Sequence, residues 1–144
     1  TLGYLVLNSS QPVTGFTSLI DNLTDDPSMA LCVTGGGTRI LIPSSTDVGP
    51  FRSSLMVINL SASSLAPITV TVRDSGGNII GQDTTHLIPQ NGFFSVDDLL
   101  TSLNISNNYG PLEVNSTNGA PLAVVSRIYS NNHTSGFFQG QDLP

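Results

Sequence analysis

The sequence contains no lysine and no tryptophan, and charged residues make up only 10% of its 144 positions. Four arginines face ten acidic residues, so the net charge is −6 and no cluster of basic side chains occurs. Nucleic acids and anionic membrane surfaces are bound through basic side chains that neutralise phosphate. The composition therefore argues against both kinds of partner.

Cysteine and long apolar runs are scarce as well. Cys32 is the single cysteine, so no disulfide can form within the chain, and its apolar neighbours predict a buried, unreactive thiol. No stretch approaches the roughly 18 apolar residues of a membrane-spanning helix, which argues against membrane insertion. Because the first residue is Thr1 and not Met, we expect a processed product or a fragment of a longer protein.

Asparagine and hydroxyl side chains supply the polarity that charges do not. Six Asn-x-Ser/Thr triplets occur, where the composition predicts about three by chance. One interpretation is a glycosylated, extracellular surface. The other is that Asn and Ser or Thr occur together because both favour turns. The candidate glycan acceptors are Asn8, Asn22, Asn59, Asn104, Asn115 and Asn132.

The clearest local pattern is the alternation of apolar and polar side chains over residues 68–73. A period of two is typical of a half-buried strand. The turn-forming residues 74–78 follow, and residues 79–88 predict a return strand that completes a hairpin. Together with the apolar run at residues 55–58, this hairpin is expected to be the centre of the fold.

Shorter strands are predicted around this hairpin, at residues 2–7, 13–20, 29–33, 39–42, 112–114, 122–129 and 136–138. Pro43 is expected to end one of them, and residues 44–50 to form a polar linker. Ser95 followed by Asp98 has the form of a capping box and predicts one short helix near residues 96–104. About ten short strands with regular turn signals predict an all-β fold, an antiparallel, immunoglobulin-like β-sandwich.

Part of the sequence repeats itself. Residues 3–10 lie over residues 110–117 and, after a two-residue insertion, Pro12 onward lies over Pro121 onward. The offset of about 108 residues is the size of one sandwich module. Within a single domain of residues 1–144, we therefore expect residues 1–45 to be the tail of a preceding repeat and residues 51–144 to be a complete repeat. The alternative is that hairpins rich in Asn and Ser look alike.

Three segments carry a resemblance to a known family, namely Phe51 to Asn59, the hairpin from Thr69 to Gly77, and Gly3 to Val6 followed by Pro12 to Phe16. They are similar to the roughly hundred-residue, immunoglobulin-like β-sandwich repeats of large secreted bacterial surface proteins. The likeness covers most of the chain, but its motifs are patterns of strands and turns and not site signatures. The resemblance implies an extracellular or cell-surface location and a structural or adhesive role, and it transfers no catalytic residues.

The residues themselves do not indicate an enzyme or a cofactor. No nucleophile elbow, phosphate-binding loop or zinc spacing is present, and the two histidines, His86 and His133, are far apart. The densest group of oxygen ligands is the loop with Asp21, Asp25 and Asp26, which are weak candidates for calcium. The alternative is a solvated acidic turn.

We therefore expect a non-catalytic structural or adhesive module that packs in tandem or associates with copies of itself. A filament joined by strand donation is one form of this hypothesis. The alternative for the donated strand is that it completes its own sheet. The alternative function is an extracellular ligand-binding module for calcium or carbohydrate, with surface glycans as partners. The candidate donated strand contains Leu2, Tyr4, Leu5, Val6 and Leu7.

Overall fold

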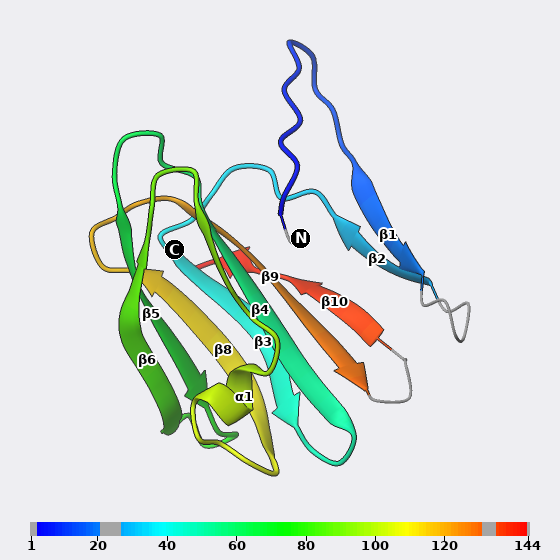
Figure 1. The fold of residues 1–144 in the computed structure, drawn as a ribbon, viewed down its shortest axis with the longest axis vertical. Helices are drawn as coiled ribbons and strands as arrows, with labels where there is room; N and C mark the ends of the chain where they lie inside the picture. The colour runs from blue at the N-terminus through cyan, green and yellow to red at the C-terminus, as the bar shows by residue number, and fades with distance from the viewer. Residues whose placement is uncertain (1–2, 21–26, 131–134, 144) are drawn as a thin grey trace.

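The structure is a computed structural model that describes residues 3–20, 27–130 and 135–143. It consists mostly of β-strands, and every neighbouring pair of strands is antiparallel (Figure 1). Its helix α1 (Leu99–Ser102) is a single turn. In the part of the chain that is described, no helix has the length and apolarity needed to span a membrane.

Two sheets pack face to face around one core. The four-stranded sheet has the order β10 (Ser135–Gln139), β9 (Leu122–Ser130), β4 (Phe51–Asn59) and β7 (Phe93–Val96). The five-stranded sheet has the order β11 (Gln141–Asp142), β3 (Arg39–Asp47), β8 (Asn108–Ser116), β5 (Ala66–Arg73) and β6 (Ile79–Ile88). The two packed sheets and the short helix confirm the predicted β-rich, antiparallel class.

The core follows from the alternation of side chains along the strands. Leu55 and Val57 of β4 face Val70 of β5 and Leu112 of β8 across the core, and all four are almost completely buried. Burial of each such side chain contributes about 1.5–3 kcal/mol relative to an exposed one. Helix α1 closes the core with two further leucines. Among the described residues, the buried core cluster contains none before Ile40.

The predicted hairpin of residues 68–73 and 79–88 is confirmed as β5 and β6. Its turn is held by the Asp74 carboxylate, which accepts hydrogen bonds from the backbone N–H of Gly76 (2.9 Å) and of Asn78 (2.8 Å). Gly77 has a φ of 84°, a conformation that glycine adopts at little cost. The expectation that this hairpin is central was wrong, because β6 is an edge strand and β4 lies in the other sheet.

The strand predicted to end at Pro43 continues to Asp47, so residues 44–50 are not simply a linker. The pairing of β3 with β8 shifts register between Ile42 and Ser45, and a bulge of this kind accommodates a proline that cannot donate a hydrogen bond. Beyond the shift, Ser45 Oγ donates to the carbonyl of Gly110 at 2.9 Å. The sandwich therefore includes β3, and the boundary expected between residues 45 and 51 falls inside it.

The helix lies in the predicted region but begins later than the capping box suggested. Ser95 belongs to β7 and is not the N-cap. The N-cap is Asp98, whose side chain accepts a hydrogen bond from the backbone N–H of Thr101 at 3.4 Å. The strand pairing of Ser95 with Met56 therefore outweighs the local capping signal.

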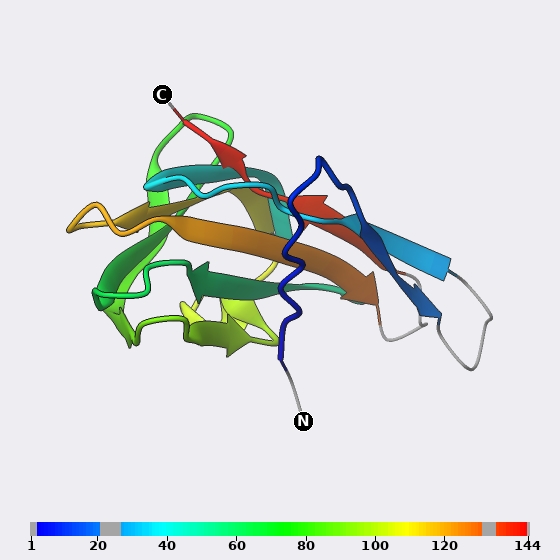
Figure 2. The same cartoon turned by 90° about the horizontal axis from the view of Figure 1, so that it is seen from above.

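The N-terminal segment, residues 3–20 and 27–34, lies outside the two sheets. A separate hairpin is formed by β1 (Phe16–Ile20) and β2 (Pro27–Leu31), and β2 lies beside β10 (Figures 1 and 2). The strand predicted at residues 2–7 is wrong for residues 3–7, which pair with no strand, and Leu2 lies outside the described residues. Tyr4 contacts the ring of Phe93 edge-on at 6.2 Å, and its hydroxyl donates to the carbonyl of Asn91 at 2.5 Å.

Candidate docking surface on the N-terminal segment

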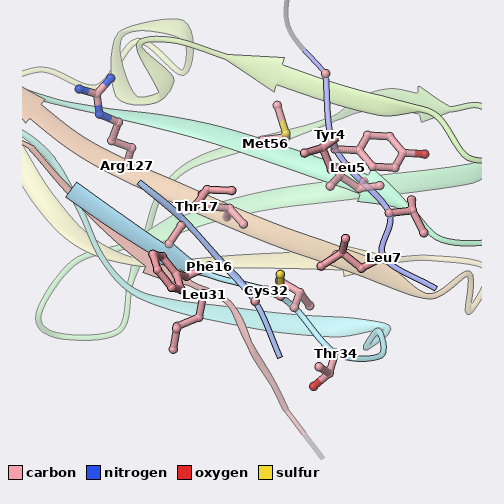
Figure 3. Close-up of a pocket in the computed structure, with 18 of the residues that line it drawn as sticks. Tyr4, Leu5, Leu7, Phe16, Thr17, Leu31, Cys32, Thr34, Met56 and Arg127 are labelled. Atoms are coloured by element: carbon pink, nitrogen blue, oxygen red, sulfur yellow. The ribbon is translucent and has the colours of Figure 1, made fainter. Parts of the chain in front are cut away.

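A cavity of about 990 Å³ lies between the N-terminal segment and the outer face of the four-stranded sheet (Figure 3). Residues 3–7 and the β1–β2 hairpin form one wall, and strands β4, β7 and β9 form the other. Most lining side chains are apolar, and the charged ones are Asp97 and Arg127. Such a lining is suited to contact with apolar surface.

The centre of the sheet side of the cavity is formed by outward-facing apolar residues. Met56 and Ile58 alternate with the core residues Leu55 and Val57 along β4, so they point away from the core. Val125 of β9 also points away from the core and lines the cavity. The apolar run at residues 55–58 indicates in the sequence that both faces of this strand are covered. A strand with one face in solvent would alternate apolar and polar side chains.

The N-terminal side of the cavity exposes large apolar side chains. Leu5, Leu7, Val13 and Phe16 are all exposed although they line the cavity. Cys32 is half-buried and not fully buried as predicted. A Cβ added at Gly15 would lie 2.9 Å from the Cys32 sulfur, so glycine allows the thiol to approach β1 closely.

The register of the β1–β2 hairpin matches that of the β9–β10 hairpin. An offset of 109 positions places Phe16 on Val125 in the first strand, and an offset of 108 places Leu31 on Gln139 in the second strand. With this one-residue difference between the two strands, the other four pairs also correspond. A further hydrogen bond is repeated just beyond the paired residues. Cys32 N donates to Gly15 O at 2.9 Å, and Gly140 N donates to Val124 O at 3.0 Å.

Corresponding residues differ sharply in burial. Leu112 and Val114 of β8 and Leu122 of β9 are each 0% exposed. Their counterparts in the repeat are Leu5, Leu7 and Val13, which are 88%, 62% and 53% exposed. The same kind of side chain at the same place in the pattern therefore fills a core in one copy and lies open in the other.

One edge of β1 has no neighbouring strand among the described residues. The bond between Cys32 and Gly15 means that alternate residues from Gly15 onward bond to β2. Phe16, Ser18 and Ile20 therefore direct their backbone N–H and C=O groups to the opposite edge. In the complete sandwich, the equivalent edge of β9 is covered by β4.

Two arginines outside the cavity join elements of the sandwich to one another. Arg39 on β3 donates two hydrogen bonds to Glu113 on β8, at 3.0 and 3.1 Å. These bonds, more than the accompanying charge attraction, lower the pKa of the Glu113 carboxyl. Arg52 forms ion pairs with Asp47 (2.7 Å) and with Asp98 (3.4 Å), which links the β3–β4 turn to the helix.

His86 also takes part in structural contacts. It pairs with Asp83 at 2.9 Å, and its ring stacks on Phe94 at 3.7 Å between centroids. Within residues 3–20, 27–130 and 135–143, no three His, Cys, Asp or Glu side chains are grouped to hold a metal ion. The calcium candidates Asp21, Asp25 and Asp26 lie outside these ranges, so calcium binding there stays a prediction.

The six candidate glycan acceptors have different environments. Asn59 is 0% exposed, and its amide nitrogen, the atom that carries a glycan, donates to three carbonyls. The folded protein therefore has no room for a glycan at Asn59, and this candidate is corrected. Asn8 and Asn104 are exposed and Asn115 is half-buried. Asn22 and Asn132 lie outside the described residues.

No family model, no curated protein and no solved structure matches this chain.

Proposed function

We propose that this chain is a non-catalytic, extracellular structural or adhesive module that acts through contacts between sandwich units. The units are copies of this chain or neighbouring repeats of one longer chain, and a filament joined by strand addition is the extreme form. Unpaired strand edges and exposed apolar faces invite such contacts.

The observation that carries this proposal is the difference in burial between the two copies of the repeat. Leu112 of β8 lies in a closed core, while its counterpart Leu5 is 88% exposed. A soluble domain rarely leaves several such side chains open together, and an open cluster usually indicates a surface that another protein covers. The shared register of the two hairpins supports the same conclusion.

The non-catalytic part of the proposal rests on what the polar side chains do. Arg39, Arg52 and His86 are each engaged with an acidic partner on the sandwich. The contacts of the two arginines join strands, a turn and the helix. The cavity itself is lined mainly by apolar side chains. The low charge and the exposed Asn8 and Asn104 triplets support an extracellular location.

An immunoglobulin-like relationship is part of the same proposal. If β3 to β9 are given the letters A to G, the neighbours β4–β7 and β5–β8 correspond to the central B–E and C–F pairs of that fold. The first and last strands are interchanged, because β3 lies beside β8 and β9 lies beside β4. The relationship proposed is therefore one of the central strands.

The test is the size of the full chain by light scattering and negative-stain microscopy across a wide range of concentrations. We expect assemblies that grow with concentration, and deletion of residues 1–8 should abolish them. The matched control is Asn78→Ala, which alters an exposed turn far from the cavity. A monodisperse species of 15.1 kDa at every concentration would overturn self-association and the filament.

A further inference from the structure

We propose that the N-terminal segment, residues 3–20 and 27–34, is the closing part of a second sandwich unit. The strand of that unit that is equivalent to β4 would pair with the open edge of β1. Strands equivalent to β3 and β5 of that unit would flank residues 3–8, as β3 and β5 flank β8. This inference rests on the proposed function and specifies the partner as a unit of the same sequence type that lacks its own closing strands.

The register of the added strand follows from the existing one. In the sandwich, Leu55 of β4 lies opposite Ser126, and Met56 lies opposite Val125. Because Thr17 and Phe16 are the counterparts of Ser126 and Val125, the added strand places its own Leu55 opposite Thr17. The N–H and C=O groups of the added strand then meet the backbone groups that Phe16, Ser18 and Ile20 direct to the open edge of β1.

The side chains of residues 3–7 fit the same arrangement. Successive side chains of an extended chain point to opposite faces, so Leu5 and Leu7 share one face while Tyr4 points to the other. Leu5 and Leu7 would thus enter the second core as Leu112 and Val114 enter the first. The contact of Tyr4 with Phe93 can persist, because it lies on the opposite face.

The chemistry of the segment suits burial. Residues 3–20 contain no charged side chain. Gly3 also corresponds to Gly110, where an added Cβ would overlap the carbonyl oxygen of Arg73 at the end of β5. Around Gly3 a Cβ would meet nothing within 4 Å. A glycine is thus present where this structure does not need one but a completed unit would.

The experiment is a fusion in which a copy of residues 37–107 precedes the full chain. Because Thr1 is the counterpart of Asn108, the copy joins Thr1 directly with the spacing of the complete unit. In a Cys32→Ser background, Thr17→Cys is combined with Leu55→Cys in the added copy. Directly opposed residues in a non-hydrogen-bonded pair have the separation that a disulfide requires.

We expect this pair to form a disulfide on oxidation, and the control pair Thr17→Cys with Val57→Cys in the added copy to remain reduced, because it is two residues out of register. Amide hydrogen exchange in the fusion without introduced cysteines should slow at Phe16, Ser18 and Ile20 by about 100-fold relative to the chain alone. The reference fusion carries Leu55→Asp and Val57→Asp in the added copy. In this fusion the three amides should exchange as fast as in the chain alone.

Two variants of the N-terminal segment distinguish a specific unit from a loose association. Leu5→Asp and Gly3→Ala should leave the unfolding midpoint of the chain alone unchanged, and each should abolish the slowed exchange in the fusion. The proposal is overturned if the control cysteine pair links as readily, if the β1 amides exchange as fast in the fusion as in the chain alone, or if the fusion fails to fold.

These outcomes are separable from those of the proposed function. A chain that self-associates in light scattering while the fusion leaves β1 open supports a structural module and refutes this assignment of the N-terminal segment. A monomeric chain whose fusion closes the edge of β1 supports a tandem arrangement within one polypeptide and refutes self-association.

Discussion

Asn59 joins three segments of backbone through one buried side chain. Its amide nitrogen donates to the carbonyls of Ser64 (2.8 Å), Pro89 (3.0 Å) and Ile88 (3.1 Å). Its amide oxygen accepts from the backbone N–H of Ser61 at 2.9 Å. Buried polar groups stabilise a fold when they are satisfied and are costly when a partner is removed.

Asn59→Ala should therefore lower the free energy of unfolding by about 3 kcal/mol, because it leaves several buried backbone groups without partners. Urea denaturation monitored by circular dichroism measures the change. Asn8→Ala removes an exposed asparagine from the same kind of triplet and should shift the midpoint very little. Equal midpoints for the two variants would contradict the role assigned to Asn59.

Glu113 should titrate below the usual range of a glutamate, because Arg39 donates hydrogen bonds to it and attracts its charge. A depressed folded-state pKa means that this pair stabilises the fold above the unfolded pKa, and that the contribution disappears as pH falls through the folded pKa. An NMR titration should show the pKa of Glu113 rising in Arg39→Gln. Asp74, whose pKa is lowered chiefly by Asn78, is the control and should not move.

Residue environments were only partly predictable from the sequence. The turn at Asp74 could be predicted because its partners lie within four positions along the chain. The triplet at Asn59 has the same pattern as the exposed one at Asn8, and only the pairing of distant segments separates them. A local motif cannot report what the rest of the chain places against it.

At the scale of elements, two residues compete for the N-cap position of α1, namely Asp98 in the structure and Ser95 in the sequence motif. Asp98→Ala should lower the free energy of unfolding by about 1 kcal/mol, because it removes the acceptor for Thr101 N. Ser95→Ala should change it by less than about 0.5 kcal/mol, because Ser95 lies within β7. Thermal unfolding of the two variants compares them directly, and a larger loss for Ser95→Ala would restore the capping box inferred from the sequence.

The crossing of β8 past the end of β5 depends on glycine. A Cβ at Gly110 would overlap the carbonyl oxygen of Arg73, so Gly110→Ala forces the two strands apart. We expect a loss of about 1–3 kcal/mol in the free energy of unfolding, the range of an overpacked core. Gly3→Ala, which meets nothing within 4 Å, is the matched control. Chemical denaturation of both variants would show whether the close approach is real.

The elements themselves were predicted better than their order. The β5–β6 hairpin has a local turn signal and alternating side chains, so its pairing follows from neighbouring residues. The pairing of Arg39 with Asn115 joins positions far apart, and no local pattern specifies it. The register shift after Ile42 depends on β8 as well, which is why Pro43 was wrongly expected to end the strand.

At the scale of the whole molecule, the sandwich and the N-terminal segment make unequal contributions to stability. Among the described residues, the first that belongs to the buried core is Ile40. The segment's aromatic contact, Tyr4 on Phe93, is worth only about 1 kcal/mol. A chain that lacks residues 1–34 should therefore unfold in one cooperative transition, with a change of less than about 2 kcal/mol. Loss of the cooperative transition in urea would contradict this division.

The candidate site depended on arrangements that the sequence indicated only in part. The repeat was visible as a faint correspondence of Gly3 to Ser10 with Gly110 to Thr117. The exposure of Leu5 could not be predicted, because its counterpart Leu112 has the same side chain and is buried. The difference lies in which strands are available to cover each copy, and that is a property of the whole assembly of strands.

The short strand β11 returns the chain to the place where the sandwich began. It pairs antiparallel with β3, and Leu143 N donates to Arg39 O at 2.8 Å, so the chain enters and leaves the sandwich at the same end. Tension applied between residues 38 and 143 would load these hydrogen bonds one at a time and not in parallel. The first length of chain would thus be released at low force while the core still holds, so the chain would lengthen before the sandwich unfolds.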